Sequence, residues 1–317
     1  MERLIIIDGN AILHRAFHAI PPLTTIKGEL VNAIFGFLSM MLRIVHDLKP
    51  AFLVVTFDRA KPTFRKKLFK AYQAKRPKMD EGLSGQIERM HEVLEKMNVS
   101  VFEMDGYEAD DVIGTITNRI KNNNKNNNIE TIIITGDRDI LQLVSDRVKV
   151  YMPVKGLSES KLFGEKEVEE KFGIKPSQIV DYKALVGDQS DNYPGVSGIG
   201  PKTASHLLSH FRTLERLYQK IDEVENENVK GKLKAGEKEA EMSKQLAQIV
   251  TNVPVDFDLK KCRLPNFDRP DIHQLLEELQ FRTLIGRLVS GNKNNELRIK
   301  NKNKEKKKDK SQQIKLF

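Results

Sequence analysis

The chain has 317 residues, of which 39% are hydrophobic, so it can bury a core in one large or two modest domains and is not disordered for most of its length. A single cysteine, Cys262, excludes an internal disulfide and a cysteine-based zinc site, and the longest apolar stretch, residues 33–42, is too short to cross a bilayer. The net charge of +9 does not by itself indicate a nucleic-acid partner, because residues 300–310 alone supply +5 of it.

Strand-like and helix-like patterns alternate over the first half of the chain. Short β-branched or apolar runs occur at residues 4–7, 52–57, 99–102 and 131–135, and segments with helical spacing separate them. This alternation predicts an α/β fold with a mostly parallel sheet that helices cover on both faces. Past Tyr151 the pattern changes to short helices joined by glycine and proline turns, including helices at 237–250 and 271–279, with no convincing strand.

Acidic residues follow three of the predicted strands, and "DGYEADDVIG" adds three more at the start of a helix. One aspartate after a strand is usually a helix N-cap. Several carboxylates at one sheet edge, however, repel each other unless cations lie between them. "GDQSDN" adds two acids with i, i+3 spacing. The resulting candidate metal ligands are Asp8, Asp58, Glu108, Asp110, Asp111, Asp137, Asp139, Asp188 and Asp191.

This set of ligands indicates the metal and the reaction. Carboxylate oxygens without histidine or cysteine favour Mg²⁺ or Mn²⁺ over Zn²⁺. Nine acids suffice for two ions, which suit in-line displacement at phosphorus and make a side-chain nucleophile unnecessary. The seven histidines show no triad or zincin spacing, and the i, i+4 pair of His14 and His18 lacks the glutamate of a zincin.

A basic insert at about 59–83 follows the second predicted strand. Nine lysines and arginines stand there against two acids, with Phe64, Phe69 and Tyr72 among them. Cations neutralise phosphates and aromatic faces stack on unpaired bases, so the insert predicts a channel for single-stranded nucleic acid, with a solvated surface helix as the alternative.

"GVSGIGPKTA", residues 195–204, reads as a helix-hairpin-helix type turn. Its glycines permit close backbone approach, and Pro201 begins a helix whose free N–H groups can bind a phosphate. We expect it to grip a duplex without reading sequence. An ordinary helix corner with Lys202 solvated is the alternative.

Five ordered motifs together resemble the 5′ nuclease domain at the N-terminus of bacterial DNA polymerase I, within the flap-endonuclease superfamily. They are "LIIIDGN", "FDRAKPTFRKKLFKAYQAKRP", "DGYEADDVIG", "ITGDRDILQLV" and "LVGDQSDNYPGVSGIGPKTA", and the resemblance runs from residue 1 to about 290. It implies a PIN-like α/β domain, a helical arch and a helix-three-turn-helix that grips duplex DNA, often with a bound K⁺. The implied activity is Mg²⁺-dependent 5′→3′ exonuclease and flap cleavage, which removes RNA primers and displaced strands. The implied setting is a cytoplasmic, nucleoid-associated protein, which we expect to be a monomer.

The resemblance also implies roles for single residues. All nine acids take metal-site roles, and Asp8, Asp58, Glu108, Asp110 and Asp111 are the core of the catalytic site. Tyr72 and Arg76 match arch residues that guide the 5′ strand and its scissile phosphate, and we add Lys75 as a catalytic candidate for the reason given below. The expected DNA contacts are Arg65, Lys66, Tyr72, Gln73, Lys75, Arg76, Gly198, Gly200, Lys202 and Thr203.

One position departs from the family pattern. Members usually carry lysine directly after the tyrosine, whereas this chain has Gln73, which brings no positive charge to the phosphate. We expect Lys75 to compensate, so that Lys75→Ala reduces activity more here than in a relative with the usual lysine.

The division into domains follows from these motifs. We expect a catalytic domain over 1–175, a helix-three-turn-helix subdomain over 176–290 and a flexible basic linker over 291–312. The final "QIKLF", 313–317, is similar to peptides that dock on the bacterial sliding clamp, with Gln313, Ile314, Leu316 and Phe317 as contacts. A frayed terminus is the alternative.

Two other functions remain open from the sequence. A PIN-type ribonuclease would need neither the basic arch nor the duplex grip. A DNA-binding adaptor recruited to the clamp would need no acids, although every metal-ligand position is filled.

Overall fold

The computed structural model describes residues 1–123, 128–156 and 159–288. Within these residues, six strands form one sheet of order β3-β2-β1-β4-β5-β6, and β6 alone runs antiparallel to its neighbour. The strands are β1 (Glu2–Asp8), β2 (Phe52–Thr56), β3 (Ser100–Phe102), β4 (Ile129–Ile134), β5 (Val148–Lys155) and β6 (Glu159–Phe163).

The central strands are apolar on both sides because helices cover both faces of the sheet. Leu4 and Ile6 of β1 pack into one core, and Ile5 and Ile7 pack into the other. A strand buried on both faces reads as a continuous apolar run, which is how β1 appeared in the sequence. The register pairs Asp8 with residue 56 of β2, so the carboxyl ends of neighbouring strands meet at one edge.

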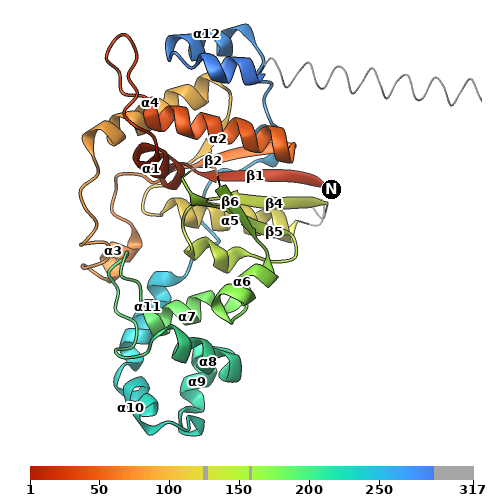
Figure 1. Cartoon of the computed structure of the whole chain (residues 1–317). Coiled ribbons are helices and arrows are strands. Elements are labelled where there is room, and N and C mark those ends of the chain that lie inside the picture. The colour runs from red at the N-terminus through yellow and green to blue at the C-terminus, as the bar shows by residue number, and fades with distance from the viewer. Residues whose placement is uncertain (124–127, 157–158, 289–317) are drawn as a thin grey trace, which may run out of the picture.

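Four helices pack on the face that contains Ile5 and Ile7, and Figure 1 shows them above the sheet. They are α1 (Gly9–Ala19), α2 (Asn32–Leu48), α4 (Glu81–Lys96) and α12 (Pro270–Glu278). On the other face lies α5 (Ala109–Asn122), which contributes Val112, Ile113 and Ile116 to the core there. These layers match the α/β architecture expected from the sequence.

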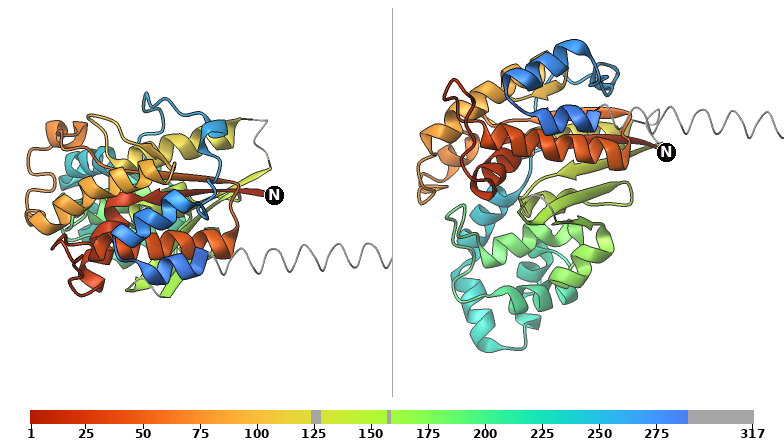
Figure 2. Two further views of the ribbon diagram at one scale, coloured as in Figure 1. Left: turned by 90° about the horizontal axis from the view of Figure 1, so that it is seen from above. Right: turned by 45° about the horizontal axis from the view of Figure 1, so that its top comes forward.

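A helical subdomain follows the sheet in the chain and lies below it in Figure 1 and in the right view of Figure 2. Its helices are α6 (Glu165–Phe172), α7 (Ile179–Val186), α8 (Pro201–Phe211), α9 (Leu214–Gln219), α10 (Glu227–Ala235) and α11 (Glu237–Ala247). The short 3₁₀ turns are η2 (Asp139–Leu143), η3 (Pro176–Gln178), η4 (Ile221–Glu223) and η5 (Leu259–Cys262). From η5 onward the chain returns to the α/β part: the Leu264 N–H donates to the carbonyl of Ala51, next to β2, and Phe267 is buried in the same core cluster as residues of α2 and α12. Figure 1 shows α12 above α2.

The strands expected at 4–7, 52–57, 99–102 and 131–135 are confirmed as β1 to β4, and α11 and α12 confirm the two helices expected near the C-terminal end. The expectation of no strand past Tyr151 was wrong, because β5 and β6 extend to Phe163. Pro153 obscured this hairpin in the sequence. The sheet tolerates Pro153 because the pairing of β5 with the edge strand β6 shifts register between Pro153 and Lys155.

The basic insert contains one short helix, α3 (Phe64–Leu68), and otherwise consists of turns and irregular chain up to α4. No helix among residues 1–123, 128–156 and 159–288 combines the length and the apolar character needed to cross a membrane. The linker at 291–312 and the peptide at 313–317 lie outside the described residues, as do residues 124–127 of the asparagine-rich loop.

Candidate active site

Three strand ends place carboxylates at one edge of the sheet. Asp8 ends β1 and caps α1, because its side chain accepts a hydrogen bond from the N–H of Ala11 at 3.0 Å. Its other oxygen accepts from the Thr135 hydroxyl, just past β4, at 2.7 Å. Asp58, two residues past β2, accepts from the N–H of Ala109 at 2.7 Å and so anchors the start of α5 beside the sheet edge.

Asp110 extends this edge from the first turn of α5. It is partly exposed, so a ligand can reach it. Surrounding protein atoms raise its pKa well above the ordinary value, and the charges of Asp137, Asp8 and Asp58 raise it further. Such mutual repulsion shows that these carboxylates from four parts of the chain face a common space.

Asp8, Asp58, Asp110 and Asp137 form no ion pair with any described residue, and we call them the uncompensated carboxylates. Burial, opposed by the hydrogen bonds from Ala11 and Thr135, raises the pKa of Asp8 to about 7. Surrounding protein atoms also raise the pKa of Asp58, although its surface is open to solvent, and that of Asp137. An excess of negative charge at a reachable protein surface is a site for a cation.

The other five predicted ligands each contact an internal cation, and we call them the paired carboxylates. They are Glu108, Asp111, Asp139, Asp188 and Asp191, and their partners are Arg65, Lys183 and Arg76. The nine acids therefore form two electrostatic classes that the sequence did not separate.

Asp111 and Arg65 form a buried bidentate pair, with Arg65 nitrogens 2.7 and 2.8 Å from the two carboxylate oxygens. Arg65 also donates to the carbonyls of Leu246 and Gln248, each at 2.9 Å, at the end of α11. The Arg65 side chain is 3% exposed and that of Asp111 is fully buried. The expectation that Arg65 contacts DNA therefore needs correction: it joins α3 to α5 and α11. Asp111 also accepts from two backbone N–H groups, so its oxygens have little capacity left for a metal.

Lys183 of α7 lies between Asp139 and Asp188. Its Nζ is 2.5 Å from an Asp139 oxygen and also pairs with Asp188. Burial works to raise the pKa of Asp188, but Lys183 outweighs it and the pKa is lowered. At Asp139, burial and the charge of Asp137 outweigh Lys183 and raise the pKa to about 7. The pKa values of the two carboxylates differ because Asp139 is surrounded by more protein atoms and feels the charge of Asp137, whereas Asp188 accepts hydrogen bonds from Ser190 and Asp191 in addition to Lys183.

The basic insert lies directly on Asp191. Tyr72 is 2% exposed, and its O–H donates to Asp191 at 3.0 Å and to Glu108 at 3.2 Å. Arg76 pairs with Asp191 at 2.5 Å. Gln73 has a positive φ of 55° and donates its backbone N–H to the carbonyl of Asp191. The Gln73 side chain lies next to both Arg76 and Asp191, while Lys66 and Lys75 are exposed.

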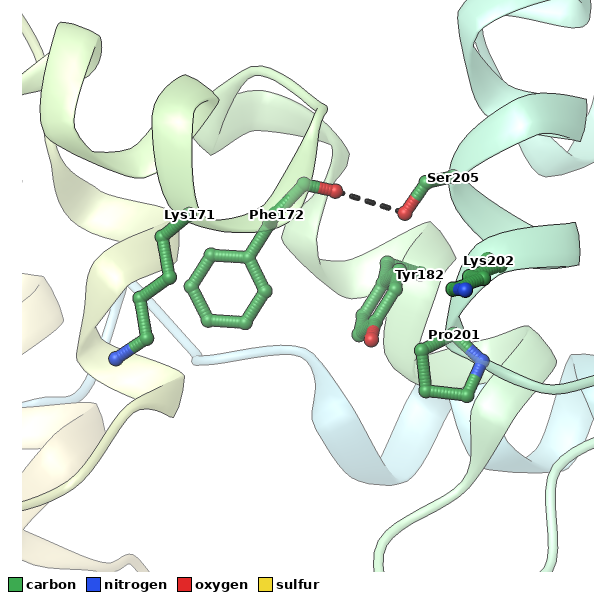
Figure 3. Close-up of a pocket in the computed structure, with 6 residues that line it drawn as sticks. All are labelled: Lys171, Phe172, Tyr182, Pro201, Lys202 and Ser205. Carbon is green, nitrogen blue, oxygen red and sulfur yellow. Dashed lines mark hydrogen bonds between the residues drawn. The ribbon is translucent and has the colours of Figure 1, made fainter.

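The glycine-rich turn leads into α8 as expected. Gly198 has a φ of 77°, which favours glycine, and Gly200 precedes Pro201 at the first position of the helix. Lys202 is exposed beside Thr203 at this helix start. A pocket of about 370 Å³ adjoins it, and Figure 3 shows its lining: Lys171, Phe172, Tyr182, Pro201, Lys202 and Ser205.

Sequence reasoning missed three residues of this region. Thr135 directly follows β4, although the sequence placed it within the strand expected at 131–135; a hydroxyl just past a strand that ends near carboxylates was a usable signal. Lys183 stands five residues before Asp188, a cation in an otherwise apolar last turn. Lys171 lies over the rings of Phe163 and Phe172, a contact that follows from the fold of β6 against α6 and that no sequence motif marks.

Two family models match the chain. The model of the 5′-3′ exonuclease N-terminal resolvase-like domain matches residues 3–173, and that of the 5′-3′ exonuclease C-terminal SAM fold matches residues 174–270. The chain belongs to the 5′-3′ exonuclease family. It is a nuclease, as the sequence motifs indicated.

Relatives of this exonuclease include DNA polymerase I of Caldicellulosiruptor bescii, 40% identical over 288 residues, and DNA polymerase I of Bacillus subtilis, 38% identical over 287 residues. Each match covers 90% of this chain but only 33% and 32% of the relative. The chain thus spans about a third of the length of these relatives.

Solved structures share the exonuclease's fold. The T5 D15 protein co-crystallised with metal ions aligns with a TM-score of 0.61 at 18% identity, covering 92% of this chain and 99% of that one. The catalytic core of Rad2 in complex with DNA substrate aligns with a TM-score of 0.59 at 14% identity, covering 92% of each chain. These likenesses confirm the architecture: a mostly parallel sheet with a helical subdomain.

The exonuclease's residues fit a divalent metal by their chemistry. The uncompensated carboxylates offer oxygen donors only, the set that Mg²⁺ and Mn²⁺ prefer. In the part of the chain that the structure describes, no three acidic, histidine or cysteine side chains lie close enough together to form a preformed metal-binding site. Their raised pKa values show that they nevertheless sense one another. Repelling carboxylates stand apart until a cation draws them together, so their separation in the metal-free protein is compatible with a metal site.

Proposed function

We propose that this chain hydrolyses phosphodiester bonds of DNA and RNA primers from a 5′ end and at 5′-flap junctions, on nucleoid DNA in the cytoplasm, with Mg²⁺ or Mn²⁺ as the cofactor. The observation that carries the proposal is the uncompensated negative charge of Asp8, Asp58, Asp110 and Asp137 at the carboxyl edge of the sheet. Membership in the 5′-3′ exonuclease family supports it.

The uncompensated carboxylates would hold the cations, with Glu108, Asp139, Asp188 and Asp191 adjoining. Bound divalent cations supply a water nucleophile at neutral pH and stabilise the leaving oxygen. Arg76 and Tyr72 border the same space from the insert, so a 5′ strand that displaces them from Asp191 would meet a guanidinium and an aromatic ring. Lys75 is exposed one residue before Arg76, and we propose that its charge acts on the same phosphate.

The helical subdomain would hold the duplex. The start of α8 presents backbone N–H groups after Gly198 and Gly200, beside Lys202 and Thr203, as an anion site requires. Lys171 and Lys202 flank the pocket of Figure 3 and add positive charge beside it. These contacts address the phosphate backbone, so we propose recognition of structure without base readout. A K⁺ ion at the turn would belong to the same grip.

The decisive experiment is cleavage of a 5′-labelled flap duplex by wild type and Asp110→Ala, each with Mg²⁺ and with EDTA. We expect products at the flap junction only for wild type with Mg²⁺. Tight flap binding without cleavage in any divalent metal would contradict the proposal and favour a DNA-binding adaptor. Equal cleavage of plain single-stranded RNA and of the flap would favour a PIN-type ribonuclease.

We also propose that "QIKLF" at 313–317 docks on a sliding clamp while the folded part acts as a monomer. The peptide lies outside the described residues, and its sequence alone supports the proposal, with Ile314, Leu316 and Phe317 as apolar anchors. Deleting 313–317 should abolish clamp binding in a pull-down and leave cleavage of free oligonucleotides unchanged. Clamp binding that survives the deletion would contradict it.

A further inference from the structure

Lys183 bridges two of the carboxylates that the sequence predicts as metal ligands. Its Nζ pairs at once with Asp139 of η2 and with Asp188, which lies between α7 and α8. These two carboxylates come from parts of the chain 49 residues apart, and the lysine is the cation that joins them. Both belong to the set that the motifs assign to metal binding.

The pairing is partly desolvated. The side chains are 17% exposed for Lys183, 14% for Asp139 and 12% for Asp188. Asp188 is further ordered by the backbone N–H of Ser190, at 2.7 Å, and by the N–H of Asp191, at 3.2 Å. A cation in such surroundings is screened little by water, so it competes strongly with any second cation for the same oxygens.

Lys244 of α11 provides an internal comparison. It also bridges two carboxylates, with Nζ 2.6 Å from Asp181 and 2.5 Å from Glu215. Neither acid belongs to the metal-ligand motifs, and Glu215 is more than half exposed. A lysine between two acids is therefore not by itself a mark of a metal site. What distinguishes Lys183 is that its partner Asp139 directly adjoins the uncompensated Asp137, whose side-chain oxygen accepts a hydrogen bond from the Asp139 N–H at 2.8 Å.

We propose that Lys183 is a resident cation: it holds Asp139 and Asp188 together in the metal-free protein, and a divalent ion binds this pair only by displacing the lysine. Lys183 is thus a positioning residue. Its ammonium group occupies the pair of Asp139 and Asp188, whereas the uncompensated carboxylates stay open to a metal ion. This inference rests on the proposed metal site and adds a competitor for it within the same chain.

The test measures metal binding without DNA and without catalysis. Mn²⁺ is titrated into wild type, Lys183→Met, Lys183→Arg and Lys244→Met, and free Mn²⁺ is followed by electron paramagnetic resonance. Lys183→Met keeps the length of the side chain and removes its charge. We expect its weakest Mn²⁺ site to tighten by about tenfold or more, because a competing positive charge is gone. Lys183→Arg and Lys244→Met should bind like wild type.

The outcomes separate the inference from the proposed function. Unchanged or weaker Mn²⁺ binding by Lys183→Met, or equal tightening by Lys244→Met, overturns the role of Lys183 and leaves the metal site standing. No Mn²⁺ binding by wild type overturns both.

A second measurement needs no variant, and it decides the question if Lys183→Met does not fold. Lysines of wild type are acetylated with and without Mn²⁺, and the modified sites are counted by mass spectrometry. Displacement predicts that Mn²⁺ increases acetylation of Lys183 and leaves that of Lys244 unchanged. Equal acetylation of Lys183 in both conditions overturns the proposal.

Discussion

The uncompensated and the paired carboxylates lie side by side, yet they differ in whether a cation of the same chain balances their negative charge. Glu108, Asp111, Asp139, Asp188 and Asp191 each have an arginine or lysine of the same chain as partner. Asp8, Asp58, Asp110 and Asp137 have no such partner among the described residues, and their pKa values are all raised. Membership in a motif therefore does not by itself show whether an acid binds a metal ion. We expect external cations to bind where the fold leaves negative charge without an internal partner.

The strongest test of the comparison is removal of one uncompensated carboxylate. Asp110→Ala should lower the rate of flap cleavage by about 10³-fold or more, since charge stabilisation by a bound metal amounts to several kcal/mol. The matched control is Asp222→Ala, whose acid is exposed and pairs with Lys234. A single-turnover assay should show wild-type rates for the control. A cleavage rate of Asp110→Ala within tenfold of wild type would contradict the assignment of the uncompensated carboxylates to the catalytic metal.

The paired class should be tested by stability. Asp111→Asn should lower the free energy of unfolding by about 3–5 kcal/mol, because it leaves Arg65 charged and buried without its partner. The double variant with Arg65→Met should lose less than the sum of the two single variants, since the stranded charge is then gone as well. Urea unfolding followed by circular dichroism measures this. Wild-type stability of Asp111→Asn would show that the pair is not structural.

Neutralising a carboxylate should change the stability of the protein in opposite directions for the two classes: it should stabilise the fold at an uncompensated carboxylate and destabilise it at a paired one. Asp110→Asn relieves repulsion with Asp137, Asp8 and Asp58, so in EDTA it should raise the melting temperature, by about 2 °C or more. Mg²⁺ should stabilise wild type more than this variant, because the variant has lost part of the negative charge that attracts the ion. Differential scanning calorimetry in EDTA and in Mg²⁺ provides both values. A lower melting temperature in EDTA would mean that Asp110 stabilises the fold.

The basic residues can also be divided into those that pair with acids of the same chain and those that do not. The effect that we expect from this difference, on duplex binding, is the smallest of the four. Arg65 and Lys183 serve the protein's own acids, whereas Lys171 forms no ion pair with a described residue and lies over aromatic rings beside the pocket of Figure 3. Lys171→Ala should therefore weaken duplex binding modestly and reduce the slope of log affinity against log salt by about 0.9. Lys166→Ala, on the same helix but paired with Glu170, is the control. Equal slopes for both variants would remove Lys171 from the DNA contacts.

Much of the sheet and of its acidic edge could be predicted from local sequence. The run before Asp8 is apolar at every position because both faces of β1 are covered, and that pattern needs no knowledge of its neighbours. The hairpin of β5 and β6 could not be predicted in the same way, because β5 contains a proline and the edge strand β6 has mostly exposed side chains, so neither strand shows a distinctive periodicity. The return of the chain before α12 to the α/β part depends equally on contacts between distant residues, such as that of Leu264 with Ala51.

By itself, the sequence determined that this protein is an α/β nuclease with carboxylates at the ends of parallel strands, since strand periodicity and motif spacing are local properties of the chain. Only the tertiary structure decided which of those carboxylates remain uncompensated. Arg65 reaches Asp111 across 46 residues and Arg76 reaches Asp191 across 115, and no local pattern encodes such pairs. The physical reason is that the energy of a charge depends on everything that surrounds it in space, and a folded chain assembles those surroundings from segments far apart in sequence.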